Sequence, residues 1–137
     1  MVIKNQSLFL SIAVGSIISL GSRGLVHVYG RNDMSIAQKM GVSWVVWDPD
    51  GIVAQLYSAW EDFTSAPGEE HHFRTPTGFD LNKSGTWTIE VALFMNFDDP
   101  VVVDSYNGTL CVVTGYAGTI TRKELEYDGA RGDIPVE

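Results

Sequence analysis

The sequence predicts an all-β fold, specifically a sandwich of short antiparallel strands. The clearest strand signal lies at residues 85–113, where apolar residues alternate with others at Trp87, Ile89, Val91 and Leu93. A period of two marks a strand with one face in a core. Turn residues also recur along the chain at about the spacing typical of a sandwich. No segment has a helical period, which excludes βαβ folds.

Composition describes a globular chain without a disulfide framework. Of its 137 residues, 45% are hydrophobic and 19% are charged, which fits one domain with a real core. The net charge of −8 argues against a nucleic-acid partner, because such proteins carry basic patches. Cys111 is the only cysteine, so we expect a buried, inert thiol and no thiolate zinc site.

The first twenty residues leave two interpretations open. Residues 8–20 are rich in apolar side chains and follow Lys4, as in a signal peptide or anchor. Serines interrupt the run, however, and it is shorter than the roughly 20 residues that a membrane-spanning helix needs. We therefore expect one or two opening strands, bent at Gly15, and no membrane span.

In the first half, each expected strand ends at a turn signal. Val26 and Val28 should share one face of the first strand after the opening segment, and Trp44 should lie on the buried face of a central strand. Residues 48–51 read Asp-Pro-Asp-Gly, a tight turn in which Pro sets φ and Gly tolerates positive φ. The expected strands are residues 25–29, 42–47 and 52–60.

The second half continues the pattern. A polar loop at residues 61–70 precedes a short strand broken around Pro76 and Gly78. The alternating strand then follows, with a turn at residues 96–100. The expected strands and returns here are residues 71–74, 79–81, 85–95, 101–103 and 110–114.

The tail after residue 114 is set apart by glycines, so we divide the chain into residues 1–114 and a C-terminal strand or arm at residues 115–137. Alternation resumes over residues 119–127, with Ile120, Leu125 and Tyr127 as its apolar members. The segment is either an extra edge strand on the same sheet or an arm that adds to a neighbouring subunit.

The arrangement of several of these residues along the chain resembles that of the immunoglobulin-like β-sandwich. Trp44 lies where such domains place a buried core tryptophan, and residues 81–87 (LNKSGTW) are similar to the turn that carries their tyrosine corner, with Trp87 in the place of the tyrosine. The inter-sheet disulfide of the family is missing. Together with the Asp-Pro-Asp-Gly turn, these motifs are similar to fibronectin-like and adhesion-type domains of virion and bacterial surface proteins. The resemblance covers roughly residues 7–114 and implies a fold rather than an activity.

Candidate chemical sites are few, and each has a plainer explanation. His71 and His72 follow two glutamates, but neighbours on a strand point to opposite faces and would not share one metal ion. Asp98, Asp99 and Asp104 are as typical of an acidic turn as of a calcium site. No nucleophile elbow, phosphate-binding loop or defined carboxylate pair is present. We therefore expect no enzyme activity, no cofactor and no metal site.

Aromatic residues around the first hairpin offer a different kind of site. If exposed, Trp47, Tyr57 and Trp60 could stack on a sugar ring, as in a carbohydrate-binding module. The structural alternative is that Trp47 and Tyr57 pair across the hairpin and cover the sheet.

These observations favour a non-enzymatic structural or interaction module of a larger repeating assembly. The expected setting is a virion, as a decoration, tail or fibre component, or a cell surface. The expected partners are copies of the chain or other assembly subunits, and the interacting residues are those of the arm. A carbohydrate-binding module and an accessory domain of a hydrolase are the alternatives.

Overall fold

The computed structural model describes residues 17–134, and this part of the chain is entirely β, with no helix. The expected opening strand and bend before residue 17 lie outside the described residues. The strands are β1 (Ile17–Ser19), β2 (Arg23–Gly24), β3 (His27–Arg31), β4 (Gly41–Trp47), β5 (Val53–Trp60), β6 (Glu70–Arg74), β7 (Phe79–Asp80), β8 (Gly85–Met95), β9 (Val101–Thr114), β10 (Glu124–Tyr127) and β11 (Ala130–Asp133).

Five strands form the main sheet, in the order β1-β9-β8-β4-β5. Four of them pair antiparallel, but β1 runs parallel to β9, with Ile17 opposite Val112. The expectation of a purely antiparallel fold is therefore wrong at this edge. No hairpin turn joins β1 to β9, which is distant in sequence, so no turn imposes opposite directions on the two strands.

Two small ladders pack on one face of the main sheet. β3 pairs with β6 and β2 pairs with β7, both antiparallel. The layers approach closely at Gly30 of β3, where an added Cβ would lie 2.7 Å from Leu93 Cδ1 of β8. The core between them consists of Val26, Val28, Met40, Val42, Trp44, Val46, Phe73, Phe79, Leu81, Trp87, Ile89, Val91, Met95, Cys111 and Val113.

The predicted buried faces are confirmed. Trp44 and Trp87 are at most 1% exposed, and both stand at the centre of the core. Each indole N–H also has a partner, as a buried Trp requires: Trp44 Nε1 donates to Gln55 Oε1 at 2.8 Å, and Trp87 Nε1 donates to the Lys83 carbonyl at 3.0 Å. The bond from Trp44 ties β5 to the core, and the bond from Trp87 ties the turn before β8 to it.

The Asp-Pro-Asp-Gly turn forms as predicted between β4 and β5. Gly51 adopts a φ of +81°, which glycine accepts without steric cost. Asp48 Oδ1 accepts hydrogen bonds from the N–H groups of Asp50 and Ile52, both at 2.9 Å. The Lys83 ammonium, 2.8 Å from Asp48 Oδ2, lowers the pKa of that carboxyl group. The ion pair thus joins the β4–β5 turn to the turn before β8.

The return strand after residue 100 differs from the prediction of two short pieces. β9 runs unbroken through residues 104–109, and its register against β8 shifts twice, between Trp87 and Thr88 and between Leu93 and Phe94. Bulges absorb extra residues without ending a ladder. Polar residues in this stretch are tolerated because most of β9 lies at or near the edge of the sheet.

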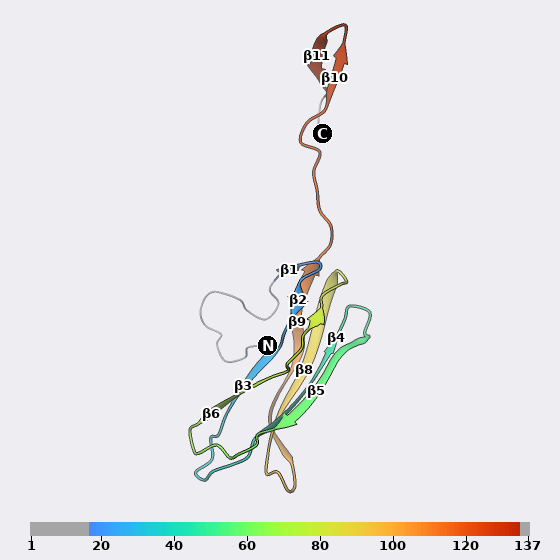
Figure 1. Ribbon diagram of the computed structural model, residues 1–137. Coiled ribbons are helices and arrows are strands. Elements are labelled where there is room, and N and C mark those ends of the chain that lie inside the picture. The colour runs from blue at the N-terminus through green and yellow to red at the C-terminus, as the bar shows by residue number, and fades with distance from the viewer. Residues whose placement is uncertain (1–16, 135–137) are drawn as a thin grey trace.

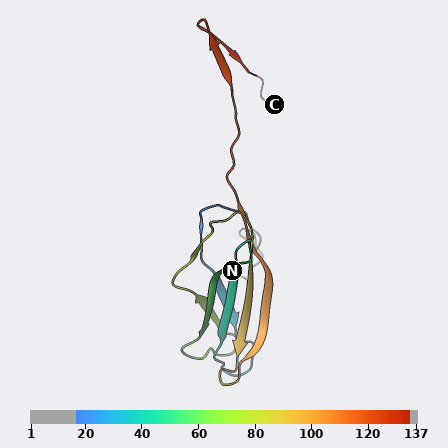
Figure 2. The same ribbon diagram turned by 90° about the vertical axis from the view of Figure 1, so that its right-hand side faces the viewer.

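The C-terminal arm is a stalk and a hairpin rather than a strand of the main sheet. From Gly115 the chain leaves the end of β9 and runs without strand structure to residue 123. β10 and β11 then pair with each other, antiparallel. Figure 1 and Figure 2 show this arm extending away from the layered body in both views. The interpretation of the tail as an extra edge strand is therefore wrong.

Candidate interaction surfaces

The arm hairpin owes its shape to an Asp-Gly turn. Asp128 and Gly129 have φ angles of 50° and 81°, the positive values that a two-residue type I′ turn requires. The hydrogen bond from Ile134 N–H to the Lys123 carbonyl, at 2.9 Å, extends the pairing one position beyond the strands. The local sequence therefore specifies the hairpin without any contribution from the body.

One face of this hairpin is apolar and uncovered. Leu125 stands opposite Gly132, and Tyr127 stands opposite Ala130. These small partners leave the two large side chains 57% and 55% exposed. Adjacent exposed apolar side chains on one face of a strand make this face a candidate surface for contact with another molecule.

The opposite face of the hairpin is charged. Glu124 lies 2.5 Å from Arg122 and 3.3 Å from Arg131. Exposed ion pairs of this kind stabilise little, by about 0–1 kcal/mol. They do give the hairpin two chemically different faces, so only one face suits an apolar partner.

The stalk presents further apolar side chains. Tyr116 is 98% exposed, and the predicted arm residue Ile120 is 65% exposed. The structure thus places Leu125 and Tyr127 together on the hairpin, whereas Ile120 lies apart from them on the stalk.

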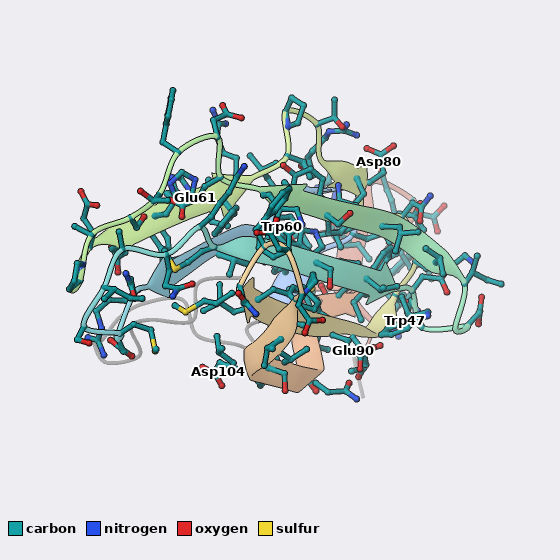
Figure 3. The ribbon with its side chains drawn as sticks, turned by 90° about the horizontal axis from the view of Figure 1, so that it is seen from below. Trp47, Trp60, Glu61, Asp80, Glu90 and Asp104 are labelled. Atoms are coloured by element: carbon teal, nitrogen blue, oxygen red, sulfur yellow. The ribbon has the colours of Figure 1, made fainter. Side chains whose placement is uncertain are left out.

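The three predicted ligand-binding aromatics do not form one surface. Tyr57 faces the core, with its ring 4.7 Å from that of Trp44. Trp47 and Trp60 lie on the opposite face of the sheet, but Trp60 stands beside Gly41, six positions along β4 from Trp47. That separation is about 20 Å along the strand. Figure 3 shows the two indoles at separate positions, with Trp60 away from Trp47.

The expected cross-strand pair of Trp47 and Tyr57 is also wrong. The register places Tyr57 opposite Trp44, and Trp47 opposite Val53, with an irregularity between Val46 and Trp47. Trp47 lies three positions from Trp44 along β4, so Trp47 and Tyr57 are not cross-strand neighbours. Trp60 instead meets the ring of Phe97 edge-on at 5.0 Å.

The polar residues at His71 belong to a hydrogen-bonded network around the buried carboxylate of Glu61. Glu61 is 6% exposed, and its carboxylate accepts hydrogen bonds from Met40 N–H at 2.8 Å and Ser65 Oγ at 2.6 Å. His71 Nδ1 lies 3.1 Å from the same carboxylate. Every oxygen of this buried group is engaged, as burial of a carboxylate requires.

His72 points to the other face of β6, as its position next to His71 predicted. Its Nε2 lies 2.7 Å from Nδ1 of His27 on β3, and its ring stacks on Tyr29 with centroids 4.4 Å apart. Burial, reinforced by the nearby His72, lowers the pKa of His27. Within residues 17–134 no three His, Cys, Asp or Glu side chains converge as metal ligands would.

Cys111 is buried at 4% exposure, and this burial raises the pKa of its thiol. The free thiol is therefore protonated and unreactive at neutral pH. The described part of the chain contains no helix that could span a membrane.

One surface was missed by sequence reasoning. A groove of about 420 Å³ opens between the two layers on the side where β3 and β9 are neighbours. Leu93, Met95 and Val103 supply its apolar part, and Asp104 adds a carboxylate to its lining. The remaining lining residues are Tyr29, Gly30, Arg31, Asp33, Met34 and Glu70. These residues come from four strands and the loop after β3, so no local sequence motif predicts that they line one groove.

Searches against protein-family models and against curated proteins find no match to this chain.

Proposed function

We propose that this chain is a non-enzymatic structural module of a repeating assembly and that its C-terminal arm makes the contact between subunits. The observation that carries the proposal is the arm hairpin, which presents Leu125 and Tyr127 on one face with no described part of the body against them. An isolated two-stranded hairpin is marginal in water, so an arm of this design gains order by docking.

The body supports the proposal because its core is complete without the arm. All core residues lie between Val26 and Val113, and the sheet ends at Thr114. Side chains that could serve catalysis, such as Glu61 and Asp48, are engaged in bonds that hold loops and turns.

An immunoglobulin-like sandwich is the proposed identity of the body. The two β layers, the buried Trp44 and the bond from Trp87 to the Lys83 carbonyl support it. In this proposal the hydrogen bond from the indole N–H of Trp87 replaces the bond that the tyrosine hydroxyl makes to the backbone in the tyrosine corner. Such modules suit a virion or a cell-surface layer, where one domain is used many times, and we propose these settings for the chain.

Size-exclusion chromatography with light scattering tests the proposed function. The full chain should form oligomers that shift with concentration. Leu125→Glu and Tyr127→Glu should each reduce the full chain to a monomer. Both residues lie on the apolar face of the hairpin, called here the docking face, and a charge on this face opposes its burial. Thr119→Glu on the exposed stalk is the matched control and should assemble as the parent chain does. A parent chain that stays monomeric at every concentration would overturn the proposal.

A further inference from the structure

The groove between β3 and β9 complements the arm, because it combines apolar side chains with a carboxylate. Its apolar part is formed by Leu93, Met95 and the 47%-exposed Val103. Asp104 also lines the groove, and among the described residues its carboxylate accepts a hydrogen bond only from the N–H of its neighbour Ser105. A partner for this groove therefore needs apolar side chains next to a cation.

The docking face of the arm has that combination. Lys123, Leu125 and Tyr127 alternate along one edge of the hairpin and so share a face. Within residues 17–134 the Lys123 ammonium makes no ion pair, whereas Arg122 and Arg131 are both held by Glu124. Two apolar side chains and one cation without an ion pair thus match the apolar part of the groove and the carboxylate of Asp104 beside it.

The edge of β9 beside the groove also lacks a ladder partner. β1 pairs only with Val112–Thr114, so residues 101–111 have no strand on that side within the described chain. An open edge accepts an added strand through main-chain hydrogen bonds, with alternate side chains entering pockets. A short strand such as β10 is suited to this addition.

The positions of arm and groove determine the direction of the contact. The arm leaves the body at Thr114, whereas Asp104 lies ten residues back along β9, about 33 Å away. Figure 1 shows the arm at one end of the body and the β8–β9 hairpin at the other. A donor at one end and a receptor toward the other end give a head-to-tail contact, which does not close on itself in a pair.

We propose that the β3–β9 groove receives the arm of a second copy of this chain, with Leu125 and Tyr127 in the groove and Lys123 paired with Asp104. The resulting chains of subunits grow head to tail. This inference rests on the proposed assembly function and names its receptor surface.

Full-length variants separate the receptor from the arm. Val103→Glu, on the groove, should abolish assembly and leave a folded monomer. Val53→Glu is the matched control: Val53 is 52% exposed on β5, outside the groove lining, and its variant should assemble normally. Unfolding midpoints in urea verify that both variants are folded. If Val103→Glu assembles as well as the parent chain while Leu125→Glu is monomeric, the arm works but the groove is not its receptor.

Mixing the variants gives a positive test. The Leu125→Glu variant has an intact groove but no docking arm, and the Val103→Glu variant has an intact arm but no receptor groove, so each should be monomeric alone. In an equimolar mixture, the intact arm should dock in the intact groove and form a dimer. This dimer should not grow, because its remaining arm and groove both carry the substitutions. A mixture that stays monomeric would contradict head-to-tail docking. Asp104→Lys should weaken assembly about tenfold or more, and Lys123→Glu in the same chain should restore most of the loss. No restoration would remove this ion pair from the proposal.

A photo-crosslinker in place of Val103 identifies the occupant directly. Crosslinks between chains that map to residues 123–133 are expected. Crosslinks within one chain, to its own arm or to residues 1–16, would show that another segment fills the groove and would overturn the inference.

Discussion

The body strand β8 and the arm strand β10 follow the same alternation but have different surroundings. In β8 the alternate residues Trp87, Ile89 and Val91 are at most 3% exposed, because the β2–β7 and β3–β6 ladders cover them. In β10 the alternate residues Leu125 and Tyr127 remain more than half exposed. Alternation therefore specifies an apolar face, and the rest of the structure decides whether this chain or another one covers it.

The largest expected difference between the two regions concerns stability. Trp87→Ala should lower the free energy of unfolding by about 3–5 kcal/mol, because it removes a large buried ring and leaves a cavity. Urea denaturation of dilute protein measures this change. Tyr127→Ala, the aromatic counterpart on the arm, should change unfolding of the monomer by less than about 0.5 kcal/mol. Equal losses would mean that the arm belongs to the body's core.

A buried polar contact should have an intermediate effect. Glu61→Ala removes the acceptor for Met40 N–H and Ser65 Oγ, and should destabilise the body by about 1–3 kcal/mol. The neighbouring Asp62 is exposed, so Asp62→Ala is the control and should be nearly neutral in thermal unfolding. A neutral Glu61→Ala would show that the loop does not depend on this carboxylate.

A turn variant should separate hairpin order from body stability. Gly129 has a φ of +81°, so Gly129→Ala should cost the hairpin about 1 kcal/mol and leave the unfolding of the body unchanged. Assembly should weaken about fivefold, measured as the concentration at half-association. Gly118→Ala on the stalk, where nothing lies within 4 Å and φ is not positive, is the control. Unchanged assembly would mean that the hairpin need not be ordered for docking.

The smallest expected effect is a pH dependence from His27. Its pKa is lowered from 6.5 in the folded body, so the unfolded chain binds the proton more readily. The stabilising contribution is complete above about pH 6.5 and is lost as the pH falls below that value. His27→Gln should therefore give a shallower fall in Tm between pH 7.5 and 5.0 than the parent chain, measured by scanning calorimetry. Identical slopes would remove His27 as the cause.

Local features of the fold could be predicted from the sequence, but long-range pairings could not. The turn at Gly51 and the buried faces of Trp44 and Trp87 follow from local patterns, as does the place where the tail departs. The parallel pairing of β1 with β9 depends on contacts between segments far apart in the sequence, and the irregularity beside Trp47 leaves no mark in the alternation of residues. The groove depends on residues from four strands and a loop. Leu125 and Tyr127 could be recognised as alternating apolar residues because alternation is local, and the Asp128-Gly129 turn that pairs β10 with β11 is a local signal as well.

Amide hydrogen exchange at two protein concentrations tests whether the arm is ordered by a neighbouring copy and the body by itself. We expect amides of residues 124–133 to exchange rapidly in dilute protein and to become protected when the chain assembles. Amides of β4 and β8 should be protected at both concentrations. Strong protection of the hairpin in dilute monomer, or no gain on assembly, would contradict the account.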